Sequence, residues 1–138
     1  MFFQPNNRET TNKGENLDIT ILLVEDDEEV REAFKDLLKA YGHNVMEADD
    51  GSSGFKIWQK HRNEIDLIIS DYHMKQMSGE EMLHAMHDVD PEVSVIIVCG
   101  RLNNSMDLKK ARSVLAKPLK AGDLVGAITS AIHPRERN

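Results

Sequence analysis

The chain has 138 residues, of which 40% are hydrophobic, and this length fits one ordinary domain with its own core. Acidic residues outnumber basic ones by 24 to 17, and the resulting net charge of -7 disfavours direct binding to nucleic acid. The single cysteine, Cys99, excludes an internal disulfide. No secretory leader is recognisable and no apolar run approaches the ~20 residues that span a bilayer. We therefore expect a cytoplasmic protein without membrane insertion.

Two polar ends flank a region in which apolar residues follow regular spacings. Residues 1–17 are rich in Asn, Thr, Glu and Gly and have almost no apolar spacing, so we expect a mobile N-terminal tail there. Residues 134–138 form a short C-terminal tail. One domain is therefore expected over residues 18–133.

The first half of this domain alternates strands with helices. Residues 19–24 are apolar on both faces, which is typical of a strand buried on both sides of a sheet. A helix is predicted over 28–41, where an apolar stripe recurs at helical spacing: Val30, Phe34, Leu37, Leu38 and Tyr41. A weaker strand follows at 43–48, then a helix at 52–61 and a strand buried on both faces at 65–70.

The second half repeats the alternation with one irregular segment. A helix is predicted at 78–89 and a fourth buried strand at 93–98. Residues 103–112 are only weakly periodic; a brief strand at 113–116 and a helix at 121–132 end the domain. Strands that alternate with helices imply right-handed crossovers and a parallel sheet covered on both faces, a three-layer α/β sandwich.

Chemically active side chains follow the predicted strands. In open parallel sheets, ligands bind beyond the carboxyl ends of the strands, so these positions form one candidate site. A carboxylate cluster there would suit a hard divalent cation, and a nearby lysine could hold a phosphoryl oxygen. Glu25, Asp26 and Asp27 follow the first strand, and Asp71 follows the third. Cys99 and Gly100 follow the fourth strand, and Lys117 and Pro118 follow the fifth.

Each of these residues also has an ordinary structural interpretation. The acidic run 25–29 could do no more than complement the dipole at the start of a helix. Asp71 could be an ordinary turn residue, and Lys117 could be an ordinary exposed lysine. Their joint placement after separate buried strands favours a site. His84 and His87 lie three apart on a predicted helix, but no third metal ligand is evident, so we interpret them as an exposed polar face.

At this point the sequence resembles the receiver domains of two-component response regulators. The resemblance covers about residues 19–132, and its motifs are ILLVEDD at 21–27, LIISDYHM at 67–74 with Gly79 following, IIVCG at 96–100 and VLAKPL at 114–119. It implies a flavodoxin-like fold with strand order 2-1-3-4-5. About five helices are expected, the fourth of them short or irregular.

The resemblance also implies a role for each site residue. Asp71 would accept the phosphoryl group, while Asp26 would bind Mg²⁺ (or Mn²⁺) directly and Glu25 through water. The backbone carbonyl of His73 would supply a further ligand, because oxygen suits Mg²⁺ better than imidazole does. Contacts to the phosphoryl group would come from Lys117, Cys99 and Gly100, and the Lys117–Pro118 peptide bond would be cis.

The implied function is phosphorelay signal transduction. A sensor histidine kinase or a histidine phosphotransfer protein would donate the phosphoryl group, and the phosphorylated protein would act on an unknown downstream protein. The protein would catalyse only its own phosphorylation and dephosphorylation, and so would not be an enzyme in the ordinary sense.

Three positions depart from the family pattern. Cys99 occupies the place of a Thr or Ser whose hydroxyl bonds the phosphoryl group, and a thiol is a weaker donor. Val114 replaces the usual aromatic switch residue, and Lys75 stands where proline is common. We therefore expect that the phosphorylation reaction itself is intact. The conformational response to phosphorylation, which passes through the switch positions Cys99 and Val114, should be modified.

Two other interpretations stay open. The chain could be a degenerate receiver that binds proteins without using phosphate, as Cys99 and Val114 would allow. It could also be an aspartate-nucleophile phosphohydrolase, although such enzymes typically carry a second Asp where this chain has His73.

Overall fold

The computed structural model describes residues 18–132, so the two predicted tails lie outside the described residues. Five parallel strands form one sheet in the order β2-β1-β3-β4-β5, which confirms the predicted flavodoxin-like topology. Four helices accompany the sheet. In chain order the elements are β1 (Thr20–Val24), α1 (Glu28–Ala40), β2 (Asn44–Ala48), α2 (Gly51–Lys60), β3 (Leu67–Asp71), α3 (Gly79–Val89), β4 (Val95–Cys99), β5 (Ser113–Ala116) and α4 (Ala121–Ile132).

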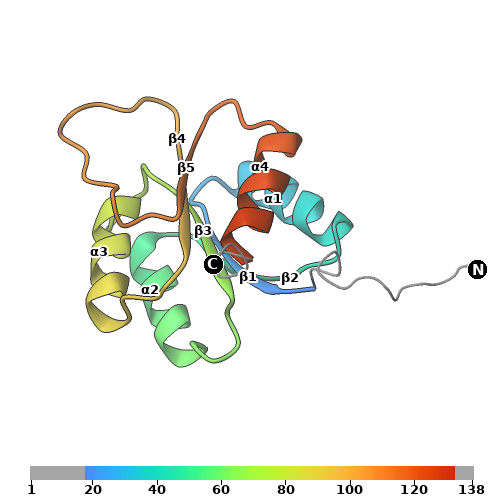
Figure 1. Cartoon of the computed structure of the whole chain (residues 1–138), viewed down its shortest axis with the longest axis horizontal. Coiled ribbons are helices and arrows are strands. Elements are labelled where there is room, and N and C mark those ends of the chain that lie inside the picture. Colours follow the sequence, from blue (N-terminus) through green and yellow to red (C-terminus); the bar gives the residue numbers. More distant parts are fainter. Residues whose placement is uncertain (1–17, 133–138) are drawn as a thin grey trace, which may run out of the picture.

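The helices cover the two faces of the sheet in pairs (Figure 1). On one face, α1 and α4 pack on the sheet through fully buried side chains such as Leu38 and Leu124. On the other face, α2 and α3 contribute Trp58 and Met82 to a second core. Strands β1, β3 and β4 lie between these two cores, because their apolar residues alternate between both faces. The three-layer sandwich expected from the alternating pattern is therefore present.

The expected fifth helix is absent from the described part of the chain. Between β4 and β5, residues 101–112 form turns and an extended loop (Figure 1). Near its start, the side chain of Asn103 accepts a hydrogen bond of 2.9 Å from the Ser105 backbone N–H, a local bond that competes with helix formation. Leu108 and Ala111 still pack against the α2–α3 core. The expectation of a short or irregular fourth helix is thus corrected to a loop anchored by two apolar side chains.

The apolar stripe of α1 is wider than the face that the helix buries. Leu38 is fully buried and Phe34 and Leu37 are partly buried, but Val30 is 41% and Tyr41 51% exposed. Val30 lies in the first turn of α1, and Tyr41 directly follows the last helical residue. The helical spacing predicted the element correctly and overestimated how many of its side chains enter the core.

No helix within residues 18–132 is long and apolar enough to cross a membrane.

Candidate functional site

Three carboxylates converge at the carboxyl end of the sheet. One oxygen from each of Glu25, Asp26 and Asp71 lies within 4.8 Å of the other two. Glu25 and Asp71 are buried, with 4% and 6% of their surface exposed, and Asp26 is half-buried. The structure thus brings together the acidic residues that the sequence placed after two different strands.

Regular secondary structure positions both parts of this cluster. The Glu25 backbone N–H donates to the Ala48 carbonyl, which extends the β1–β2 pairing beyond the end of β1. Asp71 is the last residue of β3, one position later than the strand end predicted from the sequence, and it is in register with Val98 of β4. Because neighbouring parallel strands end at one edge, the carboxylates meet there.

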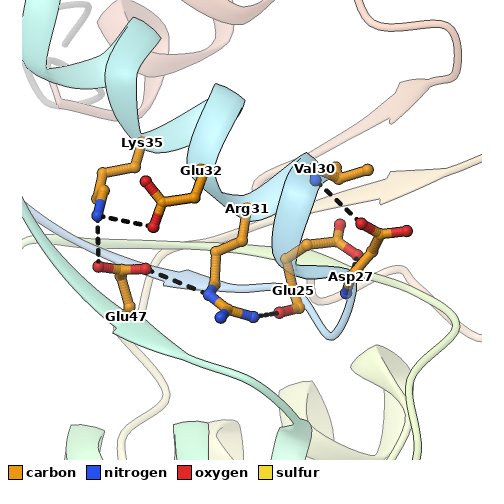
Figure 2. A network of polar contacts seen from close by, with 7 residues as sticks. All are labelled: Glu25, Asp27, Val30, Arg31, Glu32, Lys35 and Glu47. Atoms are coloured by element: carbon orange, nitrogen blue, oxygen red, sulfur yellow. Dashed lines mark hydrogen bonds and ion pairs between the residues drawn. The ribbon is translucent and has the colours of Figure 1, made fainter.

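Asp27 stands apart from this cluster and caps α1. Its side chain accepts a hydrogen bond of 3.1 Å from the Val30 N–H, and its backbone N–H donates to Oε2 of Glu25 (Figure 2). Asp27 thus acts as the N-cap of α1, with its charge at the start of the helix.

Lys117 supplies the positive charge of the site. Its Nζ lies 2.7 Å from Oδ1 of Asp71, and its side chain remains 42% exposed. The residue follows β5, where its backbone N–H donates to the Cys99 carbonyl, and its peptide bond to Pro118 is cis. The ammonium group can therefore contact both Asp71 and an incoming anionic group.

The pKa values at the site reflect this crowding of charge. Burial, followed by the nearby Asp71 carboxylate, raises the pKa of Glu25 to about 6, although a hydrogen bond from Asp27 opposes the shift. Burial alone would lower the pKa of Lys117, but its hydrogen bond to Asp71 and the negative charges of Asp71 and Glu25 together raise the pKa. The Glu25 carboxyl group therefore holds its proton more tightly than an exposed carboxyl group does.

This donor set fits a hard divalent cation. Mg²⁺ prefers oxygen ligands, usually from one or two carboxylates together with water and phosphate oxygens. Burial disfavours the ionised form of Glu25 and raises its pKa, and a bound cation would favour the ionised form of each carboxylate. His73, whose carbonyl is the predicted fourth protein ligand, is exposed in the loop after β3.

The Cys99 thiol is engaged with the backbone of its own loop. The side chain is 1% exposed, and Sγ donates to the Arg101 carbonyl at 3.2 Å. Gly100, the next residue, is exposed, and a β-carbon placed there would lie 3.9 Å from Cδ of Lys117. Val114, the other predicted switch position, is partly buried on β5.

Two glycines permit close packing around the loop that follows Asp71. A β-carbon on Gly79 would lie 2.5 Å from the Asp71 carbonyl oxygen, and one on Gly51 would lie 2.3 Å from the Met77 carbonyl oxygen. The Gly79 N–H donates to the Tyr72 carbonyl and closes this loop at the start of α3. The family motif pointed to Gly79, whereas no sequence signal distinguished Gly51 from an ordinary helix-start residue.

No local pattern in the sequence indicated a side-chain connection between β3 and the β4–β5 loop. The Tyr72 hydroxyl donates to Glu80 at 2.7 Å, and this bond, with burial, raises the pKa of Tyr72 to about 12. The same Glu80 carboxylate accepts from the Asp107 backbone N–H, and His84 bonds to the Asp107 carbonyl. His84 therefore anchors the loop to α3, and it belongs to no candidate metal cluster within residues 18–132.

Comparison with known proteins supports a single family. The family model for the response regulator receiver domain matches residues 21–129. The chain is 30% identical over 112 residues to the response regulator receiver protein CpdR of Brucella abortus (strain 2308), covering 78% of this chain and 92% of that protein. A crystal structure of a response regulator receiver domain protein from Clostridium thermocellum shares 30% identity and superposes with a TM-score of 0.78, covering 86% of this chain and 98% of that one.

Longer proteins contain a similar segment. The chain is 33% identical over 81 residues to the sensor kinase CckA of Brucella abortus (strain 2308), but this match spans only 9% of the kinase and 59% of this chain. A match to the Escherichia coli transcriptional regulatory protein GlrR spans 26% of that protein. The fold, the acidic cluster and the extent of the family match lead to one conclusion: the chain belongs to the response regulator receiver domain family of two-component systems.

Proposed function

We propose that Asp71 accepts a phosphoryl group from a phosphohistidine on a partner protein. The observation that carries this proposal is the position of Asp71, which is buried beside two further carboxylates and has Lys117 Nζ 2.7 Å from one oxygen. In the transfer, a carboxylate oxygen of Asp71 bonds to phosphorus, the P–N bond breaks, and its electron pair returns to the donor imidazole. The product is an acyl phosphate, which water later hydrolyses.

The residues around Asp71 have distinct tasks in this reaction. Lys117 holds the Asp71 carboxylate before transfer and is exposed enough to pair with a phosphoryl oxygen afterwards. Glu25, Asp26, Asp71 and the His73 carbonyl would hold Mg²⁺, or Mn²⁺, which when bound neutralises charge on the phosphoryl oxygens. The exposed Gly100 backbone N–H is available as a further donor.

The donor needs open space beside the site. A pocket lined largely by apolar side chains adjoins the cluster between α1 and the loop after β5, and Glu25 and Lys117 lie at its edge. We propose that a sensor histidine kinase or a histidine phosphotransfer protein approaches from this side. Signalling would then proceed through contacts with a downstream protein, and the only reactions catalysed would be phosphorylation and dephosphorylation of Asp71.

One observation favours a second candidate function, that of a receiver which binds its partner without using phosphate. Cys99 stands at the end of β4 where the family usually has a hydroxyl, and its thiol already donates to the Arg101 carbonyl. A phosphoryl group on Asp71 would then gain no strong bond from this position. The two candidates differ in whether Asp71 becomes phosphorylated.

Intact-mass measurement after incubation with acetyl phosphate and Mg²⁺ tests the proposal. We expect one added phosphoryl group that is lost on treatment with hydroxylamine, as an acyl phosphate should be. Asp71→Asn should abolish the adduct, whereas Asp36→Asn, a change to an exposed acid on α1, should retain it. An adduct that survives Asp71→Asn, or no adduct on the parent protein, would contradict the proposal, and the second result would favour the phosphate-independent receiver.

A further inference from the structure

A charged network on α1 and β2 reaches the backbone of the acidic cluster. Arg31 lies at its centre: Nη1 donates to the Glu25 carbonyl at 2.7 Å, and Nε donates to Oε1 of Glu47 at 3.2 Å (Figure 2). Lys35 donates to the other oxygen of Glu47 at 3.0 Å and to Glu32 at 3.1 Å. The guanidinium group therefore bridges β2 and the end of β1.

The carbonyl that Arg31 contacts belongs to the peptide that joins Glu25 to Asp26. On its other side, the Glu25 backbone N–H donates to the Ala48 carbonyl, and the Asp27 N–H donates to the Glu25 side chain. The short loop that carries two of the predicted metal ligands is thus fixed by three hydrogen bonds. Two of these three bonds are charge-assisted, since Arg31 is a charged donor and the Glu25 carboxylate, when ionised, is a charged acceptor, and such bonds are roughly twice as strong as neutral ones.

The geometry points to Arg31 as a positioning residue for the metal site: by holding the Glu25 carbonyl, it sets the orientation in which Glu25 and Asp26 present their carboxylates to Mg²⁺. This inference rests on the proposed Mg²⁺-dependent phosphorylation. Arg31 would not contact the metal itself. Residues that orient metal ligands typically change metal affinity by about 10- to 100-fold when mutated.

Glu47, on the edge strand β2, holds the guanidinium group of Arg31 in place. The side chain of Arg31 is only 16% exposed, and a guanidinium fork can bond Glu47 and the Glu25 carbonyl at the same time, which an ammonium group cannot do in the same geometry. Hydrogen bonds from Lys35 and then from Arg31 lower the pKa of Glu47, so Glu47 stays ionised and holds the fork. Lys35 bonds to Glu47 and Glu32, neither of which belongs to the acidic cluster.

A simple charge effect predicts the opposite result from a positioning role. Arg31 carries a positive charge near a site for a divalent cation, so its removal should strengthen Mg²⁺ binding if only Coulomb repulsion matters. If Arg31 positions the ligands, its removal should weaken Mg²⁺ binding despite the lost repulsion. The sign of the change in Mg²⁺ affinity therefore separates the two effects.

The experiment measures the Mg²⁺ dissociation constant by calorimetric titration, and the free energy of unfolding by urea titration in EDTA. Arg31→Met removes the donor and the charge, and Arg31→Lys keeps the charge but loses the fork. The matched control, Lys35→Met, removes a positive charge from the same network and leaves the bond between Arg31 and Glu25 intact. We expect the dissociation constant to rise about tenfold in Arg31→Met, and in the same direction in Arg31→Lys. In Lys35→Met it should not rise.

Other outcomes overturn the inference in distinguishable ways. If the parent binds Mg²⁺ and both Arg31 variants bind it equally or more tightly, Arg31 is only structural, and the proposed function stands. Reduced stability in EDTA without weaker Mg²⁺ binding would likewise show that Arg31 is only structural. If the parent itself binds no Mg²⁺, the metal-dependent part of the proposed function fails together with this inference. Should Arg31→Met not fold, Arg31→Lys decides alone, because it preserves the charge.

Discussion

Nζ of Lys117 lies 2.7 Å from Oδ1 of Asp71, and this ion pair joins the loop after β5 to the carboxyl end of β3. The pair is asymmetric, because Asp71 is 6% exposed and Lys117 is 42% exposed. Asp71 is thus fixed in the protein interior while its partner can move toward solvent. This arrangement suits the proposed phosphorylation of Asp71, because the contact between Lys117 and the Asp71 carboxylate must give way to a bond between Asp71 and a phosphoryl group.

The first prediction concerns this pair. Lys117→Met leaves the buried Asp71 carboxylate beside two others without a cation, so the free energy of unfolding in EDTA should fall by about 1–3 kcal/mol. Saturating Mg²⁺ should restore part of the loss, because it supplies the missing positive charge. Urea titration with and without Mg²⁺ measures both effects. Lys120→Met, which removes an exposed lysine nearby, should change neither value; equal effects of the two substitutions would refute a specific role of Lys117.

The second prediction concerns pH and Glu25. Burial is the main cause that raises its pKa from 4.5 to about 6, so the folded protein binds this proton more tightly than the unfolded chain does. The contribution of Glu25 is therefore most favourable below pH 4.5, and it is lost progressively as the pH rises to about 6 and above. Glu25→Gln should remove this dependence and make the metal-free protein more stable by about 1–2 kcal/mol at neutral pH. It should also weaken Mg²⁺ binding.

Urea titrations in EDTA across this pH range test the Glu25 prediction. The stability difference between Glu25→Gln and the parent should vanish below pH 4.5, where Glu25 is protonated in both the folded and unfolded states. Glu92→Gln, a change to an exposed acid outside the cluster, serves as the control and should follow the parent at every pH. A variant less stable than the parent at neutral pH would contradict the raised pKa of Glu25 in the folded protein.

The third prediction concerns the Cys99 thiol. A hydroxyl at this position could donate a charge-assisted bond of about 1.5–3 kcal/mol to a phosphoryl oxygen, whereas the thiol is a weak donor and already contacts the Arg101 carbonyl. Cys99→Thr should therefore enlarge the NMR shift changes that phosphorylation causes at Val114 and in residues 101–112. Cys99→Ala should leave them as in the parent. If the Thr variant shows no larger shifts than the parent, weak coupling through Cys99 is the wrong explanation.

The fourth prediction concerns the packing behind Asp71, the proposed acceptor. In Gly79→Ala, the new β-carbon would lie 2.5 Å from the Asp71 carbonyl oxygen, so the backbone must shift, and the free energy of unfolding should fall by about 1–3 kcal/mol. Gly126→Ala is the matched control, because nothing lies within 4 Å of a β-carbon there. That substitution, in the interior of α4, should stabilise the protein by about 0.5–1 kcal/mol. Thermal or urea unfolding measures both, and a tolerated Gly79→Ala would show that this loop is not tightly packed.

The amino-acid sequence predicted the alternation of strands and helices, except for the expected helix between β4 and β5, and it predicted the carboxylates that meet at the carboxyl edge. Strands β1, β3 and β4 are apolar on both faces, a pattern that only a sheet covered on both sides explains. Once the sheet is parallel, Glu25 and Asp71 must lie at the same edge. These predictions succeeded because they depend on local periodicity and on the direction of the chain.

Other features depend on contacts between segments far apart in the sequence. The bond from Arg31 to Glu47, 16 residues away in the sequence, joins α1 to β2, and no local spacing predicts that contact. Likewise, the loop of residues 101–112 is anchored by Leu108 and Ala111, which pack against the α2–α3 core, and by the Asp107 N–H, which bonds to Glu80. Periodicity reports which face of an element is apolar, but the pairing of polar groups across elements follows from packing. The tertiary structure alone therefore determined how the acidic cluster is supported.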